Sequence, residues 1–322
     1  MPSPRTNGLL VKFVGRCRIE DGVLNAILLL LLGLVCPPYV LYFLWQARNA
    51  RQSWGETLFQ LFSIGNPGVV NAPLASSGGA GRTTDSGDGE RSIRFVCISD
   101  THNKHDRLPW IPAGDVLVHT GDFTNQGSLK EVEDFAEWLG RQPHRVKLVV
   151  PGNHDMILDE EYYREYWSDW SPHYAQTQEA IACLEAAGAK VLIDEAVVVG
   201  GVRIFGSPWV EKTHSWRTAF NKTREELHAH WQALPAGVDV LLTHSPPLGA
   251  GDRETSGARA GCPYLASAVA QRIRPKVHVF GHVHSDAGVL CRAGTTYVNA
   301  TSVSDFYTVG GRQPFTFSVP AP

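Results

Sequence analysis

The sequence lacks an excess of charge of either sign. Its 29 Lys and Arg residues nearly balance 32 Asp and Glu residues, which gives a formal net charge of −3 at pH 7 over 322 residues. Proteins that bind nucleic acid carry a basic patch or stripe as their electrostatic footprint. Residues 92–322 contain no such stripe, and we therefore expect no nucleic-acid partner.

Paired cysteines are missing as well. The six cysteines have no paired spacing along the chain, so cysteine usage does not indicate the redox compartment.

Charged residues are absent from residues 22–47, which consist mainly of large apolar residues. A bilayer core of about 30 Å requires about 20 such residues, and the aromatic residues near the end of the run fit an interfacial belt. We predict a transmembrane helix here. Pro37 and Pro38 would kink it, which leaves a re-entrant or interfacial segment open. A cleaved signal peptide fits less well because the apolar run is too long and lacks a small-x-small site. A buried helix of a globular core is the other alternative, but no adjacent segment of the sequence could pack over it.

The basic residues around this segment favour one orientation. Arg5, Lys12, Arg16 and Arg18 precede it, whereas Arg48 and Arg51 follow it. The positive-inside rule then favours a cytosolic N-terminus and a lumenal or extracytosolic C-terminal domain in a single-pass membrane protein. The margin of two charges does not settle the topology.

Composition divides the chain into four parts. We predict an N-terminal tail over residues 1–21, the transmembrane segment over 22–47, an amphipathic stretch and flexible linker over 48–91, and a folded domain over 92–322. In the last part, apolar strand-like runs alternate with helical periodicity at 129–139, 222–234 and 264–273, and Gly200-Gly201 indicates a hairpin over 197–206. This alternation predicts an α/β (α+β) fold.

Five apolar runs in the folded domain end at residue types that bind metal ions. Carboxyl ends of strands are where open α/β sheets bind ligands, so we expect these side chains to meet at one edge. They are Asp100 and His102, Asp122, Asn153, His244, and His282 with His284.

Each residue type suits a site with two metals. The two-residue spacing of Asp100 and His102 would point both side chains the same way at a strand end. Asp122 could bridge two ions about 3.5–4 Å apart. Gly121, Gly152 and Gly281 would permit sharp turns into the ligands. Mixed imidazole and carboxylate ligands favour two divalent ions of Mn, Fe or Zn. Gly-Asp or Gly-Asn-His-Asp alone would be an ordinary turn, and it is the ordered set that is specific.

The motifs Asp-x-His, Gly-Asp, Gly-Asn-His-Asp, a lone His and Gly-His-x-His, in that order, resemble those of the calcineurin-like metallophosphoesterases. The resemblance covers roughly Ser92 to Val319 and is closest to the metallophosphoesterase-domain-containing (fetal brain protein) branch. It implies two stacked mixed β-sheets flanked by helices, a four-layer sandwich. It also implies one metal held by Asp100, His102, Asp122 and His284, and a second held by Asp122, Asn153, His244 and His282.

The resemblance also implies a reaction, the hydrolysis of a phosphate ester by a hydroxide that bridges the two metals. His154 is the expected general acid for the leaving oxygen, and Asp155 is expected to orient its imidazole. Phosphoprotein phosphatases of this superfamily carry an arginine shortly after Gly-Asp, where this chain has Asn125 and Gln126. Small-molecule phosphodiesters, with cyclic nucleotides among them, are therefore the expected substrates.

The alternative is a non-catalytic member that binds a nucleotide or a partner through the same pocket. The presence of every expected ligand, His282 included, favours the enzyme. Two further histidines, His119 and His278, lie inside apolar runs, and we expect them to be buried with hydrogen-bond partners. The sequence does not indicate the oligomeric state.

Overall fold

The computed structural model describes residues 92–212 and 217–321. The predicted N-terminal tail, transmembrane segment and linker, residues 1–91, lie outside the described residues. Every helix within the described part is too short or too polar to span a lipid bilayer.

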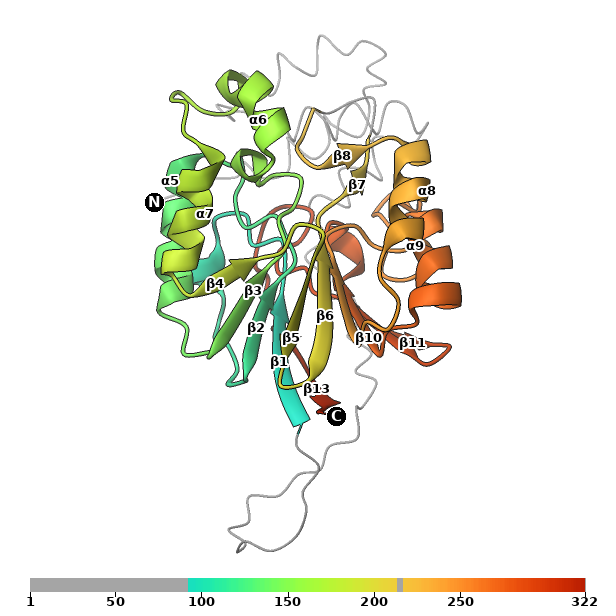
Figure 1. Cartoon of the computed structure of the whole chain (residues 1–322). Helices are drawn as coiled ribbons and strands as arrows, with labels where there is room; N and C mark the ends of the chain where they lie inside the picture. The colour runs from blue at the N-terminus through green and yellow to red at the C-terminus, as the bar shows by residue number, and fades with distance from the viewer. Residues whose placement is uncertain (1–91, 213–216, 322) are drawn as a thin grey trace, which may run out of the picture. The chain divides into compact units, whose positions relative to one another are not determined.

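Two mixed β-sheets form the centre of the domain (Figure 1). The first has five strands in the order β13-β1-β2-β3-β4. Strands β1 to β4 are mutually parallel and β13 pairs antiparallel with β1. The strands are β1 (Ser92–Ile98), β2 (Val116–His119), β3 (Val146–Val149), β4 (Ala189–Val191) and β13 (Phe315–Pro320).

The second sheet has six strands in the order β11-β12-β10-β9-β6-β5. Its four central strands are parallel, and the edge strands β11 and β5 are antiparallel to their neighbours. The strands are β5 (Glu195–Val199), β6 (Val202–Ser207), β9 (Val240–Thr243), β10 (Val277–Phe280), β11 (Gly288–Arg292) and β12 (Thr295–Asn299). A separate parallel pair joins β7 (Val210–Glu211) to β8 (Asn221–Lys222).

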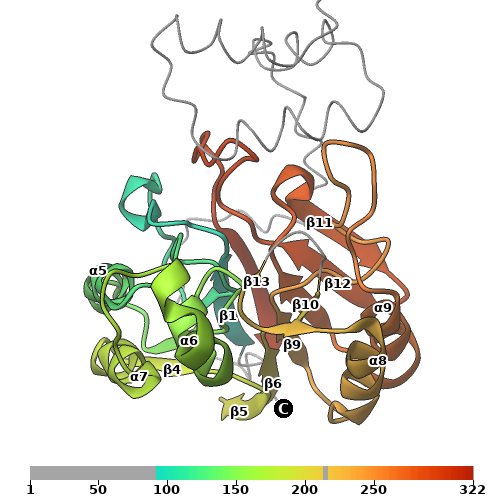
Figure 2. The same ribbon diagram turned by 90° about the horizontal axis from the view of Figure 1, so that it is seen from above.

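The sheets stack face to face, and helices cover the outer face of each one (Figure 2). Side chains on β1 show how the layers form. Phe95 and Cys97 belong to the apolar core between the sheets, whereas Val96 and Ile98 belong to the core under the helices. Successive side chains of a strand point to opposite faces, so a strand that is covered on both faces is a continuous apolar run.

Helices α5 and α7 cover the five-stranded sheet, and α8 and α9 cover the six-stranded sheet. The helices are α5 (Leu129–Gly140), α6 (Glu160–Tyr166), α7 (Thr177–Ala186), α8 (Arg224–Ala233) and α9 (Pro263–Ala268), which continues into a π-helical turn (Val269–Ile273). Helix α5 begins with a capping box, because the Ser128 hydroxyl accepts from the Glu131 N–H and the Glu131 carboxylate accepts from the Ser128 N–H. Its apolar 3.6-residue period faces the sheet, as predicted.

The predicted fold class of mixed sheets with flanking helices is confirmed. The hairpin of β5 and β6 turns at Gly200 and Gly201, both at positive φ. His119 and His278 are buried, and their Nε2 atoms lie 3.0 Å and 2.8 Å from the hydroxyls of Thr101 and Thr243. Strands β4, β7, β8 and β11 and helix α7 were not predicted; β7 and β8 have only two residues each, too few for a readable period.

Candidate metal centre

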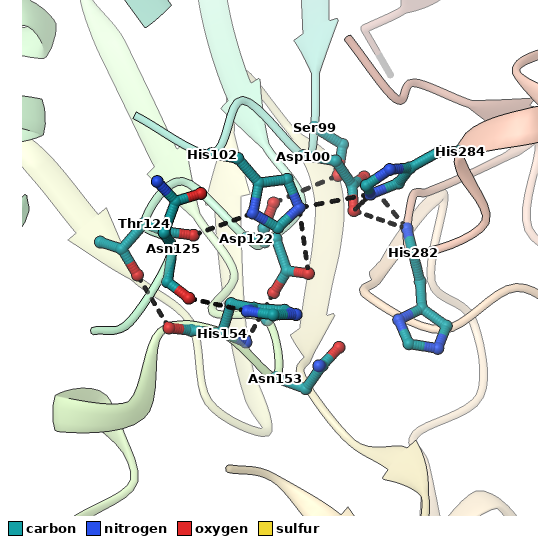
Figure 3. A network of polar contacts seen from close by, with 12 residues as sticks. Ser99, Asp100, His102, Asp122, Thr124, Asn125, Asn153, His154, His282 and His284 are labelled. Atoms are coloured by element: carbon teal, nitrogen blue, oxygen red, sulfur yellow. Dashed lines mark hydrogen bonds and ion pairs between the residues drawn. The ribbon is translucent and has the colours of Figure 1, made fainter. Parts of the chain in front are cut away.

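The carboxyl ends of five parallel strands meet at one edge of the stacked sheets. Strands β1, β2 and β3 come from one sheet, and β9 and β10 from the other. The loops after them carry all the metal ligands predicted from the sequence. Figure 3 labels these ligands with the exception of His244. Contacts between the sheets hold the edge together: the His244 Nδ1 atom lies 2.8 Å from the carbonyl oxygen of Thr120, and the His282 N–H donates to Asp100 at 3.0 Å.

The ligand loops turn sharply as they leave the strands. Asp100, His102, Asp122 and His282 all adopt left-handed backbone conformations, with φ between 42° and 70°. Non-glycine residues adopt this region uncommonly, and such strain concentrates at functional sites. Asp100 and His102 therefore meet through a turn and not through the two-residue period of an extended strand, which corrects the reason predicted for their pairing.

The glycines beside the ligands provide space more than they provide turns. Only Gly121 among the three predicted glycines has a positive φ, of 103°. A Cβ atom at Gly152 would lie 2.2 Å from Asp122 Oδ1, and one at Gly281 would lie 2.0 Å from Asp100 Oδ2. Side chains at these two positions would displace the carboxylates, so glycine is required by the close packing of the site.

Six of the predicted ligands form two groups that could each hold an ion. Asp100, His102 and His284 form one, and Asp122, His244 and His282 form the other, with the ligand atoms of each group within 4.8 Å of one another.

Asp122 joins the two groups. Its Oδ2 atom lies 3.7 Å from His102 Nε2 and 3.4 Å from His244 Nε2. The Asn153 side-chain oxygen lies 3.0 Å from the same His244 nitrogen. One carboxylate oxygen thus faces a nitrogen ligand of each group, which is the arrangement of a bridging ligand.

The histidines are oriented as metal ligands usually are. Nδ1 of His102 lies 3.1 Å from the Thr124 carbonyl oxygen, and Nδ1 of His244 is paired in the same way with Thr120. A carbonyl can only accept, so each Nδ1 carries a hydrogen, and each Nε2, once it has no proton, directs its lone pair into the site. Metal-binding histidines typically have their second nitrogen held in this way.

The two buried carboxylates of the site also favour the binding of cations. Asp100 and Asp122 are both buried, and in the described residues their ion pairs are with imidazoles. Burial opposes their ionisation, but the neighbouring histidines outweigh it and hold the pKa of each carboxyl below its usual range. Burial likewise opposes the charged form of His244, yet Asp122 raises the pKa of that ring to about 9. A divalent ion would replace this proton as the counter-charge of the carboxylates, so the donor set fits two metal ions.

His154 lies beside the two groups, as predicted for a general acid. Its ring packs edge-on against His102 with centroids 5.0 Å apart, and its N–H donates to Asp122 Oδ1 at 2.8 Å. Its Nδ1 atom lies 2.8 Å from the carbonyl oxygen of Asn125, so Nε2 is the atom left to exchange a proton within the site.

The predicted role of Asp155 is wrong. Its carboxylate accepts hydrogen bonds from the N–H groups of Asp122, Thr124 and Gly152 and from the Thr124 hydroxyl, all between 2.8 and 3.0 Å. Within residues 92–212 and 217–321 no hydrogen bond joins it to the His154 ring, which Asn125 orients instead. Asp155 is fully buried, and its hydrogen bonds join the loop after β2 to the loop after β3.

Several residues around the ligands were not predicted. The Thr301 hydroxyl donates to Asp100 Oδ2 at 2.9 Å, and Asn299 positions Thr301 by accepting its N–H at 3.1 Å. The Tyr307 ring packs against both His102 and His284, with centroids 4.6 Å and 5.3 Å away. Asn299 is the last residue of β12, but no pattern in the sequence signals the contacts of Asn299, Thr301 or Tyr307.

The fold and this site define a metallophosphoesterase. The family model for calcineurin-like phosphoesterase matches residues 93–286, and the chain belongs to that family. Metallophosphoesterase domain-containing protein 1 of Homo sapiens and of Mus musculus are each 41% identical over 217 residues, 65% of this chain and 65% of each relative. A UPF0046 protein of Caenorhabditis elegans is 38% identical over 240 residues, 72% of this chain and 83% of that protein. The match therefore spans just under two thirds of the length of the human and mouse relatives.

Proposed function

We propose that the chain is a binuclear metal-dependent phosphodiesterase that acts on small-molecule phosphodiesters, cyclic nucleotides included. The observation that carries the proposal is the position of Asp122, whose Oδ2 lies 3.7 Å from a nitrogen of one ligand group and 3.4 Å from a nitrogen of the other. When bound, two divalent ions lower the pKa of a shared water and neutralise charge on the phosphate. The mixed nitrogen and oxygen donors support Mn, Fe or Zn.

The chain's own residues supply the remaining parts of the reaction. Asp100, His102 and His284 would hold one ion, His244, His282 and Asn153 the other, and Asp122 both. His154, fixed through Nδ1 by Asn125, would deliver a proton from Nε2 to the leaving oxygen. Diesters are favoured because Asn125 and Gln126 occupy the place of the phosphate-anchoring arginine found in phosphoprotein phosphatases.

The test is hydrolysis by the metal-stripped, full-length chain titrated with Mn²⁺. Bis-p-nitrophenyl phosphate and p-nitrophenyl phosphate are compared, with Asp122→Asn as the inactive control. Metal-dependent cleavage that favours the diester and is lost in the control supports the proposal. Preference for the monoester would contradict the substrate class. Two bound metals with turnover of neither ester would favour the non-catalytic binding protein.

We further propose that residues 22–47 anchor the enzyme in a membrane with the catalytic domain on the lumenal or extracytosolic side. The uncharged segment and the basic residues before it support this orientation. The motifs Asn221-Lys-Thr and Asn299-Ala-Thr match the pattern of glycosylation sites, but glycosylation is a poor reporter of the orientation. The Asn221 amide nitrogen already donates to Thr218 and Ala219, and Asn299 is fully buried. Protease treatment of sealed vesicles is the better test. Residues 92–322 should be protected from the protease until detergent is added. Digestion without detergent would show that the catalytic domain lies on the cytosolic side.

A further inference from the structure

The Glu131 carboxylate at the start of helix α5 binds more groups than a helix cap requires. Its Oε2 atom accepts from the N–H and the hydroxyl of Ser128, both at 3.0 Å. Both oxygens also extend to the preceding loop, accepting the N–H groups of Asn125 and Gln126 at 3.2 Å. The side-chain amide of Asn103, which follows the ligand His102, donates to Oε1 as well.

We propose that Glu131 is a positioning residue for the proton transfer: it holds the loop of residues 124–127 so that the Asn125 carbonyl fixes the His154 ring. This inference rests on the proposed function, since it assigns a role within the same reaction.

The loop that Glu131 holds contacts His154 at two points. Asn125 presents its carbonyl oxygen 2.8 Å from His154 Nδ1. The Thr124 hydroxyl shares its hydrogen between the His154 carbonyl and the Asp155 carboxylate, each 2.8 Å away, and accepts the Gly127 N–H at 3.1 Å. The N–H of Asn125 is held by Glu131 and its carbonyl by His154, so Asn125 transmits the position of the carboxylate to the imidazole.

The Asn125 carbonyl also decides which nitrogen of His154 serves the reaction. It can only accept, so Nδ1 must be the donor and Nε2 the atom that passes a proton to the leaving oxygen. If the loop moves, the His154 ring can rotate about its side-chain bonds, and Nε2 no longer points toward the leaving oxygen. Positioning errors of this kind lower the rate without removing the acid.

A capping box explains only part of this arrangement, and the two roles can be separated by mutation. Ser128→Ala removes the hydroxyl of the box but leaves the contacts of Glu131 with residues 125 and 126. Glu131→Gln leaves one acceptor oxygen where two are now occupied. Glu133→Gln makes the same change of charge on an exposed position of the same helix. If Glu131→Gln fails to fold, Glu131→Asp keeps the charge at the helix start and shortens the reach to the loop.

The kinetic test compares two diesters that differ only in the leaving group, methyl p-nitrophenyl phosphate and methyl phenyl phosphate. The nitrophenolate leaves without a proton, whereas the phenolate needs one. In the Mn²⁺-loaded full-length chain, Glu131→Gln should slow the phenyl ester roughly tenfold more than the nitrophenyl ester, a part of the 10²–10⁴-fold effect of a general acid. Ser128→Ala and Glu133→Gln should keep the wild-type ratio of the two rates.

A second readout does not depend on turnover. In the metal-free full-length chain, amide hydrogen exchange of the peptide over residues 123–128 should be faster in Glu131→Gln and unchanged in Glu133→Gln. Equal slowing of both esters would make Glu131 purely structural, and an unchanged ratio in an active protein would overturn its role while leaving the proposed function intact. If the wild type cleaves neither ester, the function and the kinetic role both fail, and exchange alone decides whether Glu131 holds the loop.

Discussion

The Nε2 atoms of His102 and His284 lie 3.3 Å apart, although the two residues are 182 positions apart in the sequence. His102 comes from the loop after β1 in one sheet, and His284 from the loop after β10 in the other. The carbonyl of Thr124 orients His102 so that its Nε2 lone pair points into this gap. A cation shared with Asp100 would turn a contact between two nitrogen atoms into a bond across the two sheets.

Metal binding should therefore stabilise the protein. A ligand that binds only the folded state at 100 times its dissociation constant contributes about 2.7 kcal/mol, which for a domain of this size raises the melting temperature by roughly 5–10 °C. Thermal unfolding with and without Mn²⁺ measures the shift, which a chelator should reverse. His284→Ala should lose most of it, whereas His173→Ala, an exposed histidine, should keep all of it. A full shift in His284→Ala would exclude that residue as a ligand.

His154→Ala should separate chemistry from metal binding. The ring is not one of the expected ligands, so metal stoichiometry should be unchanged while hydrolysis of methyl phenyl phosphate falls by about 10²–10⁴-fold. Metal analysis of the purified variant beside its rate measures both quantities. Unchanged hydrolysis with both metals bound would show that His154 is not the acid.

The ligands could be predicted from the sequence because each one directly follows an apolar run. Strand ends of a parallel sheet come together whatever the order of the strands, so Asp100 and Asp122 could be grouped before the tertiary structure was known. His244 follows a strand of the other sheet, and only the stacking of the two sheets brings it to the same edge. The fold class was predicted for the same reason, since strands such as β1 and β2 are buried on both faces and read as continuous apolar runs.

Contacts between distant loops could not be predicted in this way. The Thr301 hydroxyl reaches Asp100 from 201 residues away, and no local pattern signals such a bond. Asp155 was misassigned because it adjoins His154, but adjacent side chains in a turn need not face each other. The N–H groups of Asp122 and Thr124, left free by the left-handed turn at Asp122, bind the carboxylate instead.

Asp155 should accordingly matter for stability. Asp155→Ala would leave the buried N–H groups of Asp122, Thr124 and Gly152 without their acceptor, at about 1–3 kcal/mol each. We expect a loss of at least about 3 kcal/mol in the free energy of unfolding, measured by urea denaturation of the metal-free protein. Asp155→Asn, which keeps one acceptor oxygen, should lose less. His154→Ala, at the preceding position, should lower the free energy of unfolding by less than about 1 kcal/mol. Equal losses in the two alanine variants would contradict this role of Asp155.

His278 should make stability depend on pH. Its ring is fully buried in β10, with Nε2 2.8 Å from the Thr243 hydroxyl and Nδ1 without a partner among the described residues. Burial lowers the pKa of His278 to about 3, against about 6.5 in an unfolded chain. Below pH 6.5 the unfolded chain therefore binds a proton that the folded protein does not. The free energy of unfolding thus decreases as the pH is lowered, down to about pH 3. Between pH 7 and pH 5 this residue should account for a loss of about 2 kcal/mol. Urea unfolding of the metal-free protein at the two pH values measures the loss. The free energy of unfolding should fall by about 2 kcal/mol less in His278→Leu than in the wild type and in His173→Leu. The same pH dependence in all three proteins would mean that His278 is protonated in the folded state.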